Sequence, residues 1–155
     1  MGEKKEVILS GIRPTGRLHY GNYFGAIRHF LRLQEADAQC YYFIADYHAL
    51  TTISEPENFF EETISMLRTY VACGLDPNRS VIYRQSDLPC TAELTLLLGM
   101  ITNIGHLERG TTYKDKLAKL QKDPKVEGNP LSYGLLGYPV LMAADILIVR
   151  ADQVP

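Results

Sequence analysis

The sequence predicts an α/β protein built on an open parallel sheet with helices on its faces. Short apolar, β-rich segments alternate with longer segments in which apolar residues recur at helical spacing. This order of strand, helix, strand, helix, strand is what right-handed crossovers between parallel strands produce. A glycine-containing turn also follows the first apolar segment, at the place where open α/β sheets bind ligands. We therefore expect three layers, with the turn at residues 12–22 beside the carboxyl ends of the strands.

The first half of the chain gives two strands and two helices. Residues 7–11 are apolar and predict the first strand, and residues 21–36 follow with the periodicity of a helix. Residues 40–45 are aromatic and apolar, which is typical of a second strand. The next helix is expected to begin at Ser54, a residue type that caps helices, and to end at Gly74.

The second half continues the alternation with one interruption. Residues 80–84 predict a third strand, and residues 91–107 form a strongly apolar helix. Residues 108–129 break the pattern with mixed charges, which favours a solvated loop or loose helix over a lysine-bearing segment that reaches a polyphosphate. Residues 131–144 predict a helix, and residues 146–149 predict a buried fourth strand.

Composition sets the class of protein but not its activity. The chain has 155 residues, 46% of them hydrophobic, and a net charge of -2, so bulk charge does not suggest a strongly basic nucleic-acid module. Its three cysteines form neither a zinc signature nor an obvious disulfide framework, and we expect a cytoplasmic protein with no metal-binding cluster and no membrane segment. Because the predicted fourth strand lies six residues before Pro155, we also expect the chain to be part of a longer protein.

The turn after the first strand is the first candidate site. Gly16 and Gly21 allow a ligand to approach the backbone closely, and His19 and Asn22 stand where the next helix begins. The unpaired N–H groups of a helix amino terminus suit a phosphate, and an imidazole can donate to one. The turn has neither the Gly-Lys-Ser/Thr of a phosphate-binding loop nor the dinucleotide fingerprint. On these residues alone, an ordinary turn is an equal alternative.

Two further groups of residues fall near the carboxyl edge of the expected sheet. Asp46 and His48 follow the second strand and could contact a substrate amine and ring, although His48 could equally cap the strand end. Tyr138, Met142 and Asp145 are spaced to share one helix face. An aromatic ring, a thioether and a carboxylate would form a flat apolar slot with one acceptor, which suits an aromatic amino acid with a ring N–H. On the pattern alone, ordinary core packing is favoured for this face, with Asp145 capping or ending the helix.

Several segments resemble one enzyme family. His19-Tyr20-Gly21-Asn22 resembles the first signature of class I aminoacyl-tRNA synthetases, and residues 10–16 before it look like the tryptophan and tyrosine branch. Residues 138–147, Tyr-Pro-Val-Leu-Met-Ala-Ala-Asp-Ile-Leu, resemble the indole-recognition helix of bacterial tryptophanyl-tRNA synthetases. Further matching segments occur in the same order, at residues 46–51, 74–77, 104–109 and 113–116.

The resemblance implies that residues 1–155 are a partial Rossmann-like catalytic domain with a helical insertion at roughly 80–130. This insertion serves homodimerisation in the family, and the apolar surplus of its main helix fits a buried or dimer face: Leu94, Leu97, Leu98, Met100 and Ile101. The Lys-Met-Ser-Lys-Ser loop and the anticodon-binding domain of the family are absent from this sequence, so we expect poor catalysis by this chain alone. The implied activity is tryptophan-tRNA ligase, which uses ATP with Mg²⁺ to form tryptophanyl-adenylate and then charges tRNA(Trp).

The resemblance also implies roles for individual residues. Those expected to contact ATP are Arg13, Thr15, Gly16, His19, Gly21 and Asn22. His19 and Asn22, with Lys114 and Lys116 from the lysine-rich segment, are expected to act in catalysis. Those expected to contact tryptophan are Leu9, Asp46, His48, Tyr138, Met142 and Asp145, with Asp145 accepting from the indole N–H. A buried carboxylate without a donor is costly, so we expect phenylalanine to be rejected by as much as about 10⁴–10⁵-fold.

Three alternatives stay open at this point. A tyrosyl-tRNA synthetase would need a phenol pocket with tyrosine and aspartate acceptors. Another nucleotidyltransferase could use a similar histidine-glycine turn but would lack the Met-Ala-Ala-Asp segment. A noncatalytic amino-acid- or nucleotide-binding fragment or paralogue could keep the pocket, and sequence beyond Pro155 would distinguish it from the synthetase.

Overall fold

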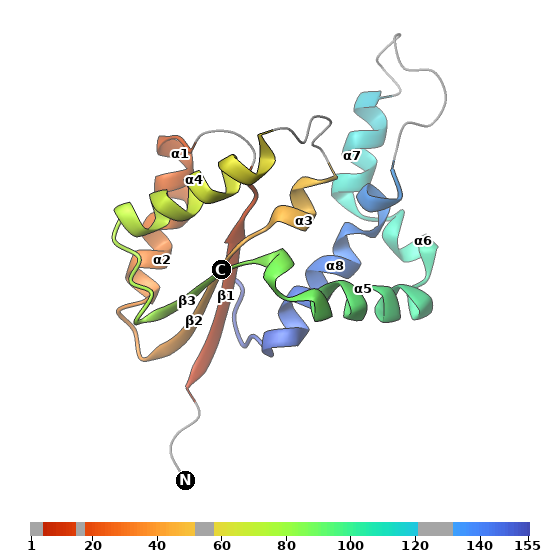
Figure 1. The fold of residues 1–155 in the computed structure, drawn as a ribbon. Coiled ribbons are helices and arrows are strands. Elements are labelled where there is room, and N and C mark those ends of the chain that lie inside the picture. The colour runs from red at the N-terminus through yellow and green to blue at the C-terminus, as the bar shows by residue number, and fades with distance from the viewer. Residues whose placement is uncertain (1–4, 15–17, 52–57, 121–131) are drawn as a thin grey trace.

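A parallel sheet of three strands lies at the centre of the fold. The computed structural model describes residues 5–14, 18–51, 58–120 and 132–155. Within these residues the strands follow the sequence order β1 (Glu6–Ile12), β2 (Ala38–Ile44) and β3 (Ser80–Arg84). Both pairings are parallel, and helices cover both faces of the sheet (Figure 1). The predicted three-layer α/β architecture is therefore confirmed.

One face of the sheet carries the larger core. It is covered by a continuous helical segment, made of α1 (Tyr20–Asn22), the π-helical turn η1 (Tyr23–Ile27) and α2 (Arg28–Leu33), and by α4 (Phe59–Ala72). The buried cluster between these helices and the sheet consists of Ile8, Ile27, Phe30, Cys40, Tyr42, Ile44, Met66, Tyr70 and Leu75. Phe30 stacks on Tyr42 with ring centroids 4.4 Å apart. The predicted start of the second helix at Ser54 lies outside the described residues.

The opposite face of the sheet is covered by α8 (Tyr133–Val149). Leu9 and Phe43 point to this side because successive residues of a strand alternate between faces, and they pack against Ile146 and Val149 of α8. Helix α5 (Pro89–Ile101) packs on α8 in turn (Figure 1). The site described below lies on this side of the sheet.

The predicted fourth strand at residues 146–149 is wrong, because α8 continues through it to Val149. Arg150 ends the helix with a left-handed backbone, φ 54°. The chain then turns beside β1, where Ile8 forms a parallel bridge with Gln153 and the Leu9 N–H donates to the Gln153 carbonyl at 3.0 Å. A short apolar run fits a buried helix as well as a strand, and the helical segment before it decides the outcome.

Short helices follow the carboxyl ends of β2 and β3. They are α3 (Asp46–Ala49) and the 3₁₀ turn η2 (Gln85–Asp87). Further along the chain, α5 ends at Ile101 rather than at the predicted residue 107, because Thr102 adopts an extended backbone. The Asn103 side chain then caps a separate helix, α6 (Ile104–Leu107).

The lysine-rich segment is helical over its first part, as α7 (Thr111–Leu120). This agrees with the loose-helix interpretation for those residues, and residues 121–131 lie outside the described part of the chain. In the sheet, β3 occupies residues 80–84, so the helical part of the predicted insertion begins with α5. None of the helices in the described ranges is both long and apolar enough to cross a membrane.

Candidate active site

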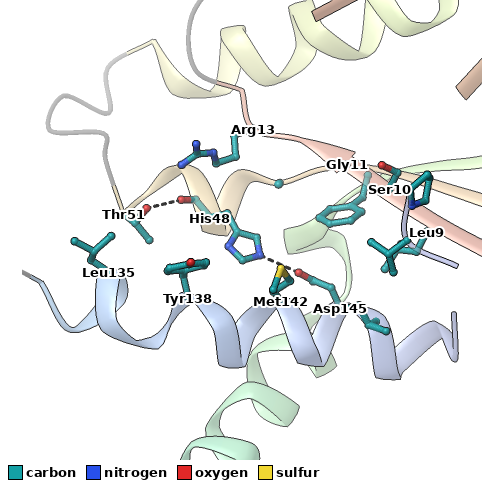
Figure 2. A pocket seen from close by; sticks show the side chains of 15 residues that line it. Leu9, Ser10, Gly11, Arg13, His48, Thr51, Leu135, Tyr138, Met142 and Asp145 are labelled. Carbon is teal, nitrogen blue, oxygen red and sulfur yellow. Dashed lines mark hydrogen bonds and ion pairs between the residues drawn. The ribbon is translucent and has the colours of Figure 1, made fainter. Parts of the chain in front are cut away.

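A cavity of about 420 Å³ lies at the carboxyl end of β1, between the sheet and α8 (Figure 2). The strands and the chain after α8 contribute Leu9, Ser10, Gly11, Phe43, Ala45, Val154 and Pro155 to its wall. The remaining lining residues are Arg13, His48, Thr51, Leu135, Tyr138, Met142, Asp145 and Ile146. Most of these side chains are apolar, and the polar ones are Ser10, Arg13, His48, Thr51, Tyr138 and Asp145. Such a wall suits a flat organic ring with one polar atom.

Helix α8 presents the three residues that the sequence places on one face. Tyr138, Met142 and Asp145 all line the cavity, so the predicted shared face is confirmed (Figure 2). Leu9, another predicted contact, enters the wall from β1 and is 1% exposed. Pro139 lies within α8 without ending it.

The carboxylate of Asp145 is buried and paired inside the protein. His48 Nε2 lies 3.0 Å from Oδ2 of Asp145, and the side-chain amide nitrogen of Gln85 donates to both oxygens, at 2.8 Å to Oδ1 and 2.9 Å to Oδ2. Asp145 is 3% exposed and Gln85 is 1% exposed. The cavity therefore has an acceptor whose charge is stabilised by two protein side chains.

Gln85 is the member of this group that the sequence interpretation missed. It is the residue directly after β3, as Asp46 follows β2, so a polar residue at the carboxyl end of a predicted strand was the available signal. The negative charge of Asp145 also reaches Tyr83, one of the last residues of β3. Burial in the first place, and then this charge, raises the pKa of the Tyr83 hydroxyl.

Asp46 is placed differently from the prediction. Its carboxylate accepts hydrogen bonds from the Ser86 N–H at 3.0 Å, from the Ser86 hydroxyl and from the Tyr47 N–H at 3.0 Å. Asp46 is 6% exposed and is not among the residues that line the cavity. It joins the start of α3 to η2, the two segments that carry His48 and Gln85.

The predicted phosphate-binding turn forms a compact cap at the start of α1. The Gly21 N–H donates to Nδ1 of His19 at 3.1 Å, and the His19 N–H donates to the side-chain oxygen of Asn22 at 3.0 Å. Because Nδ1 accepts, the proton of the neutral ring is on Nε2, which can donate to a ligand. A side chain at residue 21 would place its Cβ 2.8 Å from the His19 ring, so it would displace the ring from this cap.

The turn and the Asp145 cavity are distinct in the described structure. His19 lines a second cavity of about 590 Å³ with residues of η1 and α4, and Arg13 lines the first. Thr15 and Gly16, between them, lie outside the described residues. Lys114 is exposed on α7, and Lys116 lies in the same helix. The structure brings His48, Tyr138, Met142, Asp145, Leu9 and Arg13 together at one cavity, and His19, Asn22 and Lys114 are not among the residues that line it.

Comparison with known proteins agrees with this geometry. The family described as tRNA synthetases class I (W and Y) matches residues 2–155. The tryptophan–tRNA ligase of Fusobacterium nucleatum is 52% identical over 147 residues, which cover 95% of this chain and 42% of that protein. The tryptophanyl-tRNA synthetase of Campylobacter jejuni, solved with ADP and tryptophan, superimposes with a TM-score of 0.84 at 42% identity, over 96% of this chain and 44% of that one.

A more distant solved structure has the same fold. The tyrosyl-tRNA synthetase of Archaeoglobus fulgidus, complexed with L-tyrosine, superimposes with a TM-score of 0.74 at 20% identity, over 98% of this chain and 46% of that one. The chain thus spans less than half the length of these relatives. With the family match over nearly every residue and the Rossmann-like sheet that it shares with them, the chain belongs to the class I tRNA synthetases of the tryptophan and tyrosine group.

Proposed function

We propose that this protein is a tryptophan-tRNA ligase, and that residues 1–155 are the amino-terminal part of its catalytic domain. The observation that carries the proposal is the Asp145 carboxylate, held by His48 and Gln85 at an otherwise mainly apolar cavity. An indole ring has one N–H and a flat apolar surface, so it complements this wall. Leu9, Tyr138 and Met142 would pack on the ring.

The proposed chemistry has two steps. In the first, a carboxylate oxygen of tryptophan attacks the α-phosphorus of ATP, forming tryptophanyl-adenylate and releasing pyrophosphate. In the second, a ribose hydroxyl of tRNA(Trp) attacks the acyl carbon and AMP leaves. The protein positions the reactants and stabilises the developing charge, and Mg²⁺ arrives with ATP.

The turn before α1 is the proposed ATP contact. His19 Nε2 would donate to a phosphate oxygen, and Gly21 and Asn22 would shape the turn. Arg13, Thr15 and Gly16 would complete the ATP site, and Lys114 and Lys116 would reach the phosphates from α7.

Tryptophan is favoured over tyrosine by the character of the cavity and by the relatives. Met142 adds a polarizable thioether to the cavity that Asp145 also lines, and this suits the flat face of an indole. At 42–52% identity, the relatives described above are tryptophan enzymes, whereas the tyrosine enzyme shares 20% identity and shows the fold alone.

We also propose that the protein acts as a cytoplasmic homodimer. A row of large apolar residues on α5 and α6 is exposed: Leu96, Leu97, Met100, Ile101 and Ile104. Leu94 and Leu98, on the same helix, are half-buried. An exposed apolar row of this kind is typical of an interface between copies.

Amino-acid-dependent exchange of pyrophosphate with ATP tests the proposal in the full-length protein. Tryptophan should support exchange, while tyrosine and phenylalanine should support it far more weakly. Exchange that is fastest with tyrosine would establish the tyrosine alternative. Absence of exchange with every amino acid, in a protein that still binds tryptophan, would establish the noncatalytic alternative.

A further inference from the structure

The side chain of Gln85 joins three parts of the candidate site. Its amide nitrogen donates to both oxygens of Asp145 on α8, and its amide oxygen accepts from the His48 backbone N–H on α3 at 3.3 Å. Gln85 itself begins η2, next to the end of β3. One amide group thus holds both the Asp145 carboxylate and the backbone of His48, whose ring is the other partner of that carboxylate.

We propose that Gln85 is a positioning residue that determines recognition of the ligand's ring N–H by aiming the Asp145 carboxylate. This inference rests on the proposed function and adds to it a residue that touches no substrate. It predicts that Gln85 controls the choice between ligands with and without a ring N–H, and not the general shape of the cavity.

The amide of Gln85 can adopt only one orientation here. If the amide were rotated by half a turn, its oxygen would face both oxygens of a carboxylate, and its NH₂ group would face the His48 N–H. Both contacts would be repulsive. The observed orientation therefore follows from the chemistry of the three groups.

This arrangement leaves one oxygen of the carboxylate with hydrogen-bonding capacity to spare. Among the described residues, Oδ2 of Asp145 accepts from both His48 and Gln85, whereas Oδ1 accepts from Gln85 alone. A carboxylate oxygen can accept about two hydrogen bonds, so Oδ1 has capacity for the ring N–H. The Gln85 amide holds the plane of the carboxylate so that this position stays fixed.

The turn that carries Gln85 is itself fixed by its neighbours. The Arg84 guanidinium pairs with Asp87 at 2.6 Å, and the Arg84 N–H donates to the same carboxylate at 3.0 Å. The side-chain hydrogen bond from Arg84 is the main cause that lowers the pKa of Asp87. Asp46 holds Ser86 on the other side. The residues on both sides of Gln85 are therefore held by hydrogen bonds, and a residue that positions the Asp145 carboxylate needs such support.

The test compares two ligands that differ in the ring N–H. Tryptophan and β-(3-benzothienyl)-alanine have similar two-ring side chains, but the second has sulfur in place of N–H. Their Kd values would be measured by calorimetry, without ATP, for the full-length protein and for Gln85→Met, which keeps the volume and removes both hydrogen-bonding groups. We expect the Kd of tryptophan to rise about 10-fold or more, because a hydrogen bond to a charged acceptor is lost or misdirected. The Kd of the sulfur analogue should change by less than about threefold.

Gln34 provides a matched control. It is a second buried glutamine that bridges two segments, with its amide nitrogen donating to the Gly74 carbonyl at 3.0 Å and its oxygen accepting from the Asp76 N–H at 3.1 Å. It lies outside the cavity wall. Gln34→Met should lower the thermal unfolding temperature and leave the ratio of the two Kd values unchanged.

The outcomes separate the inference from the proposed function. Equal weakening of both ligands in Gln85→Met, or no weakening of tryptophan, overturns the positioning role. If Gln85→Met does not fold, Gln85→Asn is measured instead, because its shorter side chain keeps the amide but withdraws it from Asp145; an unchanged ratio there overturns the role as well. Failure of the unsubstituted protein to bind tryptophan overturns the proposed function, which is a different result.

Discussion

Nε2 of His48 lies 3.0 Å from Oδ2 of Asp145, although 97 residues separate them in the chain. In this pairing Nε2 carries the proton and donates, which leaves Nδ1 of the neutral ring as an acceptor. The His48 ring lies between Tyr138 and Asp145 in the cavity (Figure 2). The two side chains thus form one polar unit on the wall of the proposed tryptophan site.

Substitution of Asp145 should reduce the preference for an amino acid with a ring N–H over one without it. Asp145→Ala in the full-length protein should weaken tryptophan-dependent pyrophosphate exchange and narrow the gap between tryptophan and phenylalanine. His48 and Gln85 already satisfy the carboxylate, so phenylalanine does not leave it without a donor. We therefore expect the hydrogen bond itself to contribute about 10–100-fold, less than the sequence alone predicts.

Asp145→Asn is the control for charge at nearly constant size. It should keep more of the tryptophan preference than Asp145→Ala, because its amide oxygen can still accept. If both variants keep the ranking and the ratios of tryptophan, tyrosine and phenylalanine, Asp145 has no part in recognition.

His19 should act mainly in the transition state. His19→Ala is expected to lower kcat of pyrophosphate exchange by about 10–100-fold and to change the tryptophan Kd little, because the donor that it removes is the proposed ATP contact. His19→Asn separates this role from capping, since asparagine can accept the Gly21 N–H but lacks Nε2. The asparagine variant should recover thermal stability without recovering kcat, and full recovery of kcat would contradict the assignment.

Asn22 completes the same cap by accepting from the His19 N–H. Asn22→Ala is expected to lower kcat as well, with a smaller loss than His19→Ala if its role is only to orient the turn. The same exchange assay measures this, together with a thermal unfolding curve. Normal exchange in both His19→Ala and Asn22→Ala would remove the turn from the mechanism.

The free energy of unfolding should decrease at high pH because two tyrosines are buried in the folded protein. Burial raises the pKa of the Tyr42 and Tyr70 hydroxyls, and both residues are fully buried. Their contribution is fully present below the unfolded pKa, about 10, and is lost as pH rises above it, because only the unfolded chain then releases their protons. Each should reduce the free energy of unfolding by about 1.4 kcal/mol per pH unit above that value.

Urea unfolding between pH 9 and 11 measures this slope. Tyr70→Phe should make the decrease of the unfolding free energy with pH less steep by the contribution of one tyrosine hydroxyl. Tyr42→Phe should have the same effect on the slope, and it also removes the hydrogen bond from the Tyr42 hydroxyl to the Phe30 carbonyl. That carbonyl also accepts from the Gln34 N–H, so the cost at pH 7 should be only about 1 kcal/mol. An unchanged slope in both variants would contradict the prediction.

The exposed row on α5 should hold two copies together. Met100→Glu places a charge at a residue that is 73% exposed here, and it should convert the proposed dimer to a monomer in light scattering coupled to gel filtration. Val71→Glu on α4 is the control, because it adds the same charge to an exposed apolar residue on the other side of the sheet. A monomeric unsubstituted protein at micromolar concentration, or a Met100→Glu dimer, would count against this interface.

The sequence by itself determined the order of the three strands with helices between them and the shared face of Tyr138, Met142 and Asp145. Both are properties of local periodicity: residues four and three apart on a helix meet on one side wherever the helix lies.

Only the tertiary structure decided the partners of these residues. The hydrogen bonds of Gln85 to Asp145 and of Asp46 to Ser86 join residues 60 and 40 positions apart, and no local pattern encodes such pairs. At residues 146–149 the apolar run by itself fits a strand as well as a helix. In the structure Ile146 and Val149, three positions apart, both pack against the cluster of Leu9 and Phe43, which a helix allows and a strand does not, because residues three apart in a strand point to opposite faces.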